Sequence, residues 1–360
     1  MIRYIDEFRE KQLVQVLVDQ IHKHSGNKVR FMEVCGGHTM AIQRYGIPSM
    51  LPPAVELLSG PGCPVCVSSR NFIDIAIAYS KQENLIVTTF GDLIRVPGSS
   101  STLEKEKSKG RDIRIVYSIL DAVKIAARNP EKRIVFLGIG FETTAPTSAA
   151  AILIAHEQHI PNFFLLSSHK VMPPAMQAIV DEGINIHGYI APGHVSTITG
   201  SSIYTPILEK YGIGSVISGF EPVDLLQSIL MLLKQTEKGQ PGVEIQYKRA
   251  VHPEGNLKAL SMMDEVFELR NDWWRGLGII PSSGLKLKTK YKRFDAEENI
   301  HAAVEPTKED KGCICGEILK GLKKPVDCPL YQKVCTPSDP VGACMVSSEG
   351  ACHAFFKYGL

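Results

Sequence analysis

The chain has 360 residues, of which 44% are hydrophobic and 22% are charged, and its formal net charge is +2. This length exceeds a typical single core and predicts two or three domains. The small net charge argues against a nucleic-acid partner, because phosphate-binding proteins usually carry a concentrated basic face. We expect a cytoplasmic protein with no membrane partner, since residues 1–20 do not resemble a signal peptide and no apolar run reaches the roughly 18 residues of a membrane span.

The first predicted elements are a helical lead-in and an α/β domain. Residues 1–28 place apolar side chains near helical spacing and end close to Gly26, which predicts a helix. The α/β domain, residues 29–118, has predicted strands at 29–34, 55–59 and 85–89 and predicted helices at 41–45 and 71–82. Strands separated by helices indicate a parallel sheet with crossover helices. The polar, glycine-bounded stretch 98–110 is expected to be a surface loop.

A second α/β domain is predicted at residues 119–240, where the same alternation resumes after a strand at 113–117. Its strands are expected at 133–138, 162–166, 188–191 and 215–218, and its helices at 120–128, 145–156, 173–181, 202–211 and 223–236. We therefore predict two tandem doubly wound, Rossmann-like parallel-sheet domains, with functional groups at the carboxyl ends of the strands.

The composition changes in residues 241–360. Residues 273–284 contain glycines and a proline and are expected to be irregular, and six of the nine cysteines follow Glu305. A tail with few apolar side chains is expected to depend on a bound cluster for its fold. This predicts a smaller cysteine-rich iron–sulfur domain, because a static disulfide framework is unusual in a reducing compartment.

Cys35 and His38 form the first candidate metal site, at the end of an apolar run interrupted by Arg30 and Glu33. A thiolate and an imidazole suit iron, zinc or copper. Two ligands are too few to hold a metal tightly, so the site would be open to a partner or substrate. The alternative is a buried cysteine beside a capping histidine.

Cys63 and Cys66 have the CxxC spacing of a redox-active thiol pair. Half of a zinc site and a purely structural role are the competing interpretations.

The stretch from Gly138 to Thr143 lacks the third glycine of a dinucleotide fingerprint, so a nicotinamide site is not favoured. Glu142, Thr143 and Thr144 are instead expected to cap the next helix, where backbone N–H groups can hold an anion. His194, in a glycine-proline loop, is by itself more typical of a hydrogen-bonded loop histidine than of a ligand.

The tail offers more thiols than one site needs. One choice of four, with gaps of twelve, six and sixteen residues, is Cys315, Cys328, Cys335 and Cys352. Four thiolates without paired histidines favour a [4Fe–4S] cluster over a structural zinc ion. Composition alone does not select the ligands, and it gives no role to Cys313 or Cys344.

Four motifs and the cysteine-rich tail together resemble the hydrogenase maturation factor HypD family over essentially the whole chain. The motifs are CGGHTM at 35–40, GPGCPVC at 60–66, GFETTAP at 140–146 and PGHVSTITG at 192–200. The resemblance implies a scaffold on which the Fe(CN)2CO unit of [NiFe]-hydrogenase is assembled. It also implies a tail [4Fe–4S] cluster, for which the four cysteines above are the assigned ligands.

The resemblance further implies partners and site roles. Cys35 would ligate the transient iron together with the N-terminal cysteine of a small HypC-type chaperone, with His38 as a neighbour or second ligand. HypE would deliver cyanide, carried as a thiocyanate made from carbamoyl phosphate with HypF. Motif membership places Glu142, Thr143, Thr144 and His194 around a cleft. The chain is expected to be a monomer that joins these partners.

Electron delivery suggests a role for the CxxC pair, because releasing cyanide from a thiocyanate sulfur requires reduction. A relay from the cluster through Cys63 and Cys66 to iron at Cys35 is the resulting hypothesis. The chain would then be an assembly scaffold with redox activity rather than a conventional turnover enzyme. Two alternatives are an iron–sulfur disulfide reductase and a zinc hydrolase that uses Cys35, His38 and a distant histidine.

Overall fold

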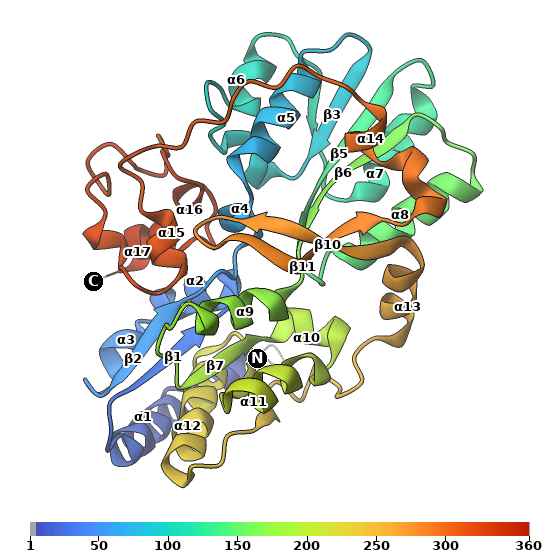
Figure 1. The fold of residues 1–360 in the computed structure, drawn as a ribbon. Coiled ribbons are helices and arrows are strands. Elements are labelled where there is room, and N and C mark those ends of the chain that lie inside the picture. The colour runs from blue at the N-terminus through green and yellow to red at the C-terminus, as the bar shows by residue number, and fades with distance from the viewer. Residues whose placement is uncertain (1–4, 360) are drawn as a thin grey trace.

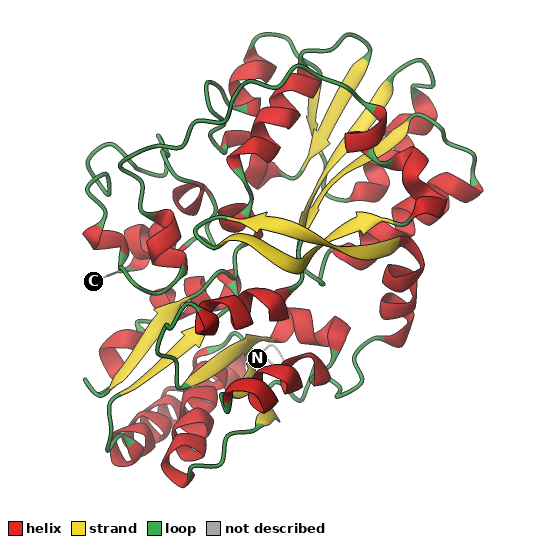
Figure 2. Ribbon diagram, viewed as in Figure 1, coloured by secondary structure: helices red, strands yellow, loops and turns green. Residues whose placement is uncertain are grey.

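The computed structural model describes residues 5–359 and contains two parallel sheets, an antiparallel hairpin and a C-terminal segment of short helices (Figures 1 and 2). The predicted fold class, α/β with two doubly wound parallel sheets and a smaller cysteine-rich part, is confirmed. No helix within residues 5–359 is long and apolar enough to cross a membrane. The predicted helical lead-in is found as η1 (Asp6–Arg9) and α1 (Lys11–His24), and its residues 1–4 lie outside the described residues.

The first sheet has five parallel strands in the order β2-β1-β7-β8-β9. Their bounds are β1 (Val29–Glu33), β2 (Val55–Ser59), β7 (Gly188–Pro192), β8 (Gly214–Ser218) and β9 (Val243–Ile245). One face packs against α1, α2 (Gly36–Arg44) and α12 (Pro222–Lys238). The other face packs against α9 (Met172–Asp181) and α11 (Thr205–Tyr211). Both faces are covered, which explains the nearly continuous apolar sequence of the central strands.

The second sheet has four parallel strands in the order β4-β3-β5-β6. Their bounds are β3 (Leu85–Thr89), β4 (Ile113–Ile115), β5 (Arg133–Gly140) and β6 (Phe163–His169). Helices α7 (Ile119–Arg128) and α8 (Ala145–Glu157) cover one face, and α5 (Arg70–Ser80) and α6 (Leu103–Ser108) lie on the other side.

Helix α6 corrects the predicted loop at 98–110. The hydroxyl of Thr102 accepts a hydrogen bond from the Lys105 N–H at 3.1 Å and caps the helix, while Leu103 is fully buried. A short helix with one apolar anchor shows no periodicity, so its charged sequence looked like a solvated loop.

The sheets do not divide the chain at residue 118 as expected. Strands β1 and β2 pair with β7, β8 and β9, so the first sheet is built from two segments that flank the whole second sheet. Phe31 in β1 is paired with Gly188 in β7, whereas β3 pairs with β4 and β5. The alternation of strands and helices is the same for either pairing, so the sequence pattern could not distinguish them.

A hairpin occupies the stretch that was expected to be irregular. Its strands β10 (Phe267–Trp274) and β11 (Gly278–Leu287) follow α13 (Leu257–Val266) and cross the molecule between the two sheets (Figure 1). Gly276 and Gly278 turn the chain with φ angles of +82° and +71°, which favour glycine. Trp274 is fully buried, and its indole N–H donates to the Ser283 hydroxyl at 2.8 Å.

The C-terminal segment packs against the part of the chain that carries the first two motifs (Figure 1). Helix α16 (Ala343–Val346) contacts α4 (Pro64–Val67), and α17 (Ala351–Tyr358) contacts α2. The remaining short helices are α3 (Ile47–Met50), α10 (Gly193–Thr199), α14 (Ala296–Asn299) and α15 (Cys315–Leu319), with the 3-10 turns η2 (Gly91–Arg95), η3 (Ser202–Tyr204), η4 (Thr289–Phe294) and η5 (Pro325–Asp327).

Candidate functional site

The candidate site lies where the strand order of the first sheet reverses. Strands β1 and β7 are neighbours, yet the helix after β1 packs on one face of the sheet and α11, which follows β7, packs on the other. Ligands of open α/β sheets bind at the carboxyl ends of strands at such a switch point. Cys35 follows β1 and His194 follows β7, so both sequence-predicted residues lie there.

Cys35 is the N-cap residue of α2 and is partly exposed. Desolvation by the surrounding chain raises the pKa of its thiol to about 12, although the backbone N–H groups of His38 and Gly37 favour the thiolate. The thiol is therefore protonated at neutral pH. A metal that binds to the sulfur must displace this proton, as is general for thiolate ligands.

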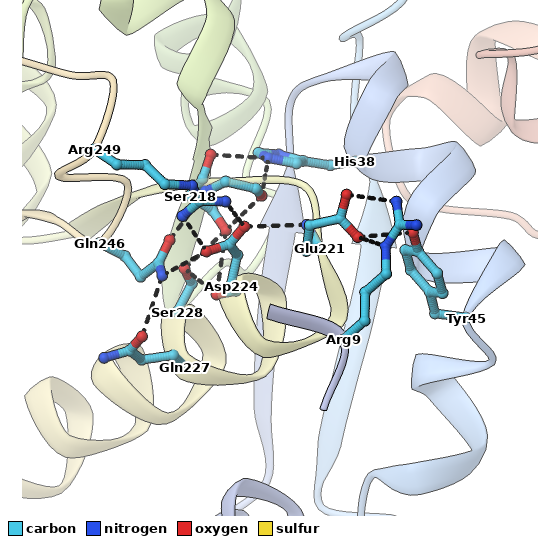
Figure 3. Close-up of polar contacts among 11 residues, drawn as sticks. Arg9, His38, Tyr45, Ser218, Glu221, Asp224, Gln227, Ser228, Gln246 and Arg249 are labelled. Atoms are coloured by element: carbon cyan, nitrogen blue, oxygen red, sulfur yellow. Dashed lines mark hydrogen bonds and ion pairs between the residues drawn. The ribbon is translucent and has the colours of Figure 1, made fainter. Parts of the chain in front are cut away.

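The His38 ring is fully buried and is held in one tautomer. Its Nε2 lies 3.2 Å from the Ser218 carbonyl oxygen and 3.0 Å from that of Gly219 (Figure 3). Since both partners are acceptors, Nε2 carries the hydrogen and Nδ1 keeps a lone pair. Nδ1 is buried and has no hydrogen-bond partner among the described residues. Burial lowers the pKa of His38 to about 4, so the ring is neutral, which is the form that binds metals.

Phe220 contacts both candidate histidines and was missed by sequence reasoning. Its ring centroid lies 4.6 Å from that of His38 and 3.9 Å from that of His194. His38 and His194 therefore both pack against one aromatic ring. No sequence signal distinguished this phenylalanine from an ordinary core residue.

A charged network fixes the loop that carries Phe220 and the two carbonyl groups (Figure 3). The fully buried carboxylate of Asp224 accepts hydrogen bonds from Arg249 at 2.8 and 2.6 Å and from the backbone N–H of Glu221 at 3.1 Å. Glu221 in turn accepts from Arg9 and from the Tyr45 hydroxyl. Paired, hydrogen-bonded buried charges of this kind specify one loop conformation.

Glu33 is a second residue of the candidate site that was not selected from the sequence. It is buried at the end of β1 and accepts hydrogen bonds from the Cys35 backbone N–H at 3.0 Å and the Thr39 hydroxyl at 2.5 Å. Burial raises the pKa of its carboxyl group to about 8, although these hydrogen bonds oppose the shift. The available signal was a carboxylate inside an apolar strand, which is unusual without a specific role.

The CxxC loop is attached directly to the Cys35 turn. Cys63 and Cys66 are buried and joined by a disulfide, with their Cα atoms 5.2 Å apart. The Gly36 N–H donates to the Gly62 carbonyl oxygen at 2.9 Å. A Cβ atom at Gly62 would collide with the backbone of Cys35, so only glycine permits this approach.

The six tail cysteines converge on one region next to this loop. Five of them line a single pocket, namely Cys313, Cys315, Cys328, Cys335 and Cys352. Cys344 is fully buried beside them, and hydrogen bonds from Cys313, Cys344 and Cys352 lower the pKa of the Cys315 thiol. Within residues 5–359 no three cysteine, histidine or carboxylate side chains are already arranged as a metal site. The donor chemistry of the pocket is nevertheless purely thiol, which fits an iron–sulfur cluster or zinc.

Glu349 connects the tail to Cys35 and was also missed. Glu349 lies between α16 and α17, and a Cβ atom added to Gly36 would be 2.6 Å from the Cβ of Glu349. Burial raises the pKa of the Glu349 carboxyl group. The tail therefore places an acidic side chain over the turn that carries Cys35.

The GFETT motif approaches the site from the second sheet, but its side chains do not cap the next helix, α8, as expected. The Glu142 carboxylate accepts the Met172 N–H of α9 at 2.9 Å, not an N–H of α8. The Thr144 hydroxyl points back to the carbonyl oxygens of Ile139 and Phe141, each at 3.3 Å, and Thr143 is half-buried. A threonine hydroxyl can bond to carbonyl groups of the preceding turn or to N–H groups of the next helix, and these two alternatives compete.

Glu142 has one further property that suits a site. Burial raises the pKa of its carboxyl group to about 7, and its Oε2 is buried and has no hydrogen-bond partner among residues 5–359. The buried phenol of Tyr204 is close enough to both Glu142 and Cys35 for each to raise its pKa, although burial is the largest cause. Residues from both sheets thus meet near Cys35.

Comparison with known proteins gave matches over nearly the full length. A family model named HypD and described as "Hydrogenase formation hypA family" matches residues 12–359. The chain is 46% identical to a hydrogenase maturation factor HypD2 of Bradyrhizobium diazoefficiens over 369 residues, covering 99% of this chain and 97% of the relative. It is 46% identical to a putative hydrogenase expression/formation protein of Methanocaldococcus jannaschii, covering 97% and 98%. A hydrogenase maturation factor HypD of Cupriavidus necator is 44% identical, covering 99% and 97%.

Proposed function

Because the chain belongs to the HypD family of hydrogenase maturation factors, we propose that it is the scaffold on which the Fe(CN)2CO unit of a [NiFe]-hydrogenase is assembled. Iron, the cargo, is held at Cys35 together with the N-terminal cysteine of a small HypC-type chaperone. HypE supplies the cyanide. In this role the chain is an assembly scaffold with redox activity rather than a conventional turnover enzyme.

The single observation that carries the proposal is an incomplete donor set at the switch point. Cys35 offers a partly exposed sulfur, and His38 offers a buried Nδ1 lone pair with no partner among residues 5–359. Two protein donors leave most of an iron coordination shell open. Open positions are required if the cargo must gain a partner's thiolate, cyanide and carbon monoxide and later be released.

The tail supports the electron supply that cyanide delivery needs. Its thiol-only pocket suits a [4Fe–4S] cluster, and we assign Cys315, Cys328, Cys335 and Cys352 as the ligands. Such a cluster, when bound, would supply single electrons to this part of the protein. The chain itself keeps the Cys63–Cys66 pair buried, packs α4 against α16 and bonds Gly62, just before α4, to the Cys35 turn.

The alternative functions fit less well. A reductase that acts on other proteins' disulfides needs an accessible thiol pair, but Cys63 is 3% exposed and Cys66 is 0% exposed. A zinc hydrolase would need a third donor near Cys35 and His38. Within the described residues no group of three cysteine, histidine or carboxylate side chains is arranged to hold a metal ion, so His194 does not complete such a site here.

Infrared spectroscopy of the chain isolated with its small chaperone tests the proposal. Bands in the cyanide and carbonyl stretching regions are expected, and Cys35→Ser should abolish them. Cys63→Ala with Cys66→Ala should still form the chaperone complex but should yield no hydrogenase activity. Cys313→Ser is the matched control and should retain both. Absence of the bands in the wild type contradicts the scaffold, and full activity of the double variant contradicts the relay.

A further inference from the structure

The turn of the β10–β11 hairpin reaches the helix that carries the CxxC pair. The guanidinium of Arg275 donates from Nε to the Cys66 carbonyl oxygen at 3.0 Å and from Nη2 to that of Ser68 at 2.9 Å. The backbone N–H of Arg275 donates to the Val67 carbonyl oxygen at 3.0 Å. One residue thus satisfies three consecutive carbonyl groups at the end of α4, which would otherwise lack partners.

The same turn also touches the cysteine-rich tail. Gly276 packs directly on Gly316, since a Cβ atom at Gly316 would lie 2.7 Å from the Cα of Gly276. Gly316 follows Cys315, which lines the thiol pocket. Arg275 therefore lies between the Cys63–Cys66 pair and the thiol pocket.

The charge of Arg275 is only weakly neutralised. Its side chain is 10% exposed, and its ion-pair partner is Glu309, at 3.4 Å, whose side chain is 52% exposed. An exposed ion-pair partner neutralises little of a cation's charge, because water and salt screen the interaction. A nearly buried cation bonded to the backbone of the CxxC helix is costly unless an anion forms nearby.

We propose that Arg275 is a positioning residue that holds α4 in place and makes the Cys63–Cys66 disulfide easier to reduce. Reduction breaks the Sγ–Sγ bond, takes up two electrons and one proton, and leaves one thiol and one thiolate. In the experiment below a dithiol, dithiothreitol, is the reductant and becomes the cyclic disulfide. Inside the protein the new negative charge forms on the CxxC pair, whose Cys66 carbonyl oxygen accepts a hydrogen bond from the guanidinium at 3.0 Å, and Cys63 Sγ also accepts the Cys66 N–H at 3.3 Å. Without the cation, the buried thiolate would be strongly disfavoured.

This inference rests on the part of the proposed function that makes Cys63 and Cys66 redox-active. The full-length chain is equilibrated in buffers of reduced and oxidised dithiothreitol, and free thiols are alkylated. Mass spectrometry of the peptide containing both residues then gives the fraction reduced. Arg275→Met and Arg275→Gln should shift the equilibrium about tenfold toward the disulfide, or about 30 mV for a two-electron couple. Arg275→Lys, which keeps the charge, should stay within about twofold of the wild type, as should the control Glu309→Gln.

The outcomes are distinguishable. Wild-type equilibrium in folded Met and Gln variants would overturn the role of Arg275 and leave the relay intact. A lysine variant shifted as far as the methionine variant would also overturn it, because the charge would not be the cause. If Arg275→Met does not fold, the Gln variant, which keeps amide donors for the carbonyl groups, gives the decisive value. A wild-type pair that never cycles would refute the relay and this inference together.

Discussion

Replacing His38 in two ways separates its structural role from its proposed role at iron. In His38→Gln, the side-chain amide can reach the position of Nε2 and still donate to the carbonyl oxygens of Ser218 and Gly219. It places no lone pair at the position of Nδ1. His38→Ala loses both functions and also the contact with Phe220.

The expected magnitudes differ clearly. Each lost hydrogen bond to a buried carbonyl group contributes about 1 kcal/mol, and truncating a large buried side chain adds about 2–5 kcal/mol. We expect His38→Ala to lower the free energy of unfolding by about 4–7 kcal/mol and His38→Gln by about 1 kcal/mol. Both variants should lose iron binding with the chaperone, because neither keeps the Nδ1 donor.

The dependence of stability on pH gives an independent check. The pKa of His38 is about 4 in the folded chain, against 6.5 for the free side chain. Between these values the unfolded state binds more protons, so the contribution of His38 is complete above pH 6.5 and is lost as the pH falls toward 4. The loss is about 3 kcal/mol, and His38→Gln should remove it.

Urea unfolding between pH 4 and 8 measures stability, and metal analysis of the chaperone complex measures iron. A glutamine variant as unstable as the alanine variant would refute the hydrogen-bonding role assigned to Nε2. A glutamine variant with wild-type iron would refute Nδ1 as a ligand.

Two further predictions concern buried groups near the same site. The pKa of Glu33 is about 8, above its usual 4.5. The contribution of its protonated carboxyl group to the free energy of unfolding is therefore present below pH 4.5 and is lost as the pH rises through 8. In urea unfolding at pH 8.5, Glu33→Gln should therefore be more stable than the wild type by about 2–5 kcal/mol. The exposed control Glu104→Gln should keep the wild-type dependence of stability on pH. Equal stability of Glu33→Gln and the wild type would contradict the raised pKa of Glu33. In the tail, serine at any assigned cluster ligand should reduce iron and acid-labile sulfide from about four irons per chain to near zero. Cys313→Ser and Cys344→Ser should retain the cluster, and loss in either would revise the ligand set.

The sequence predicted local elements much better than their partners. The strands at 55–59 and 85–89 have the predicted bounds, and the candidate cysteines do follow strand ends. The pairing of β1 with β7 was not predicted, because alternating apolar runs carry no information on which edge a strand occupies. The β10–β11 hairpin was missed because its glycines and proline indicate turns and hide the alternation beside them.

Part of the site could be read from residue types, and part could not. Closely spaced cysteines and histidines are recognisable in the sequence because metal binding and redox chemistry are the usual roles of such groups. Glu33, Glu349 and Arg275 belong to types that are usually exposed, so the sequence alone gives no reason to bury them. Their importance comes from contacts with segments that are distant in the chain, such as Arg275 with Cys66.

The discontinuous first sheet also determines when the site can form during synthesis. Cys35 and His38 leave the ribosome early, but of the two strands that pair with β1 only β2 follows soon, whereas β7 begins at Gly188, and the carbonyl groups that fix His38 belong to Ser218 and Gly219. The four strands of the second sheet are all made before residue 170 and can pair first. If the chain is the iron scaffold proposed above, iron offered to a nascent chain would find a thiol without its oriented imidazole, and loading would wait until most of the polypeptide has been translated.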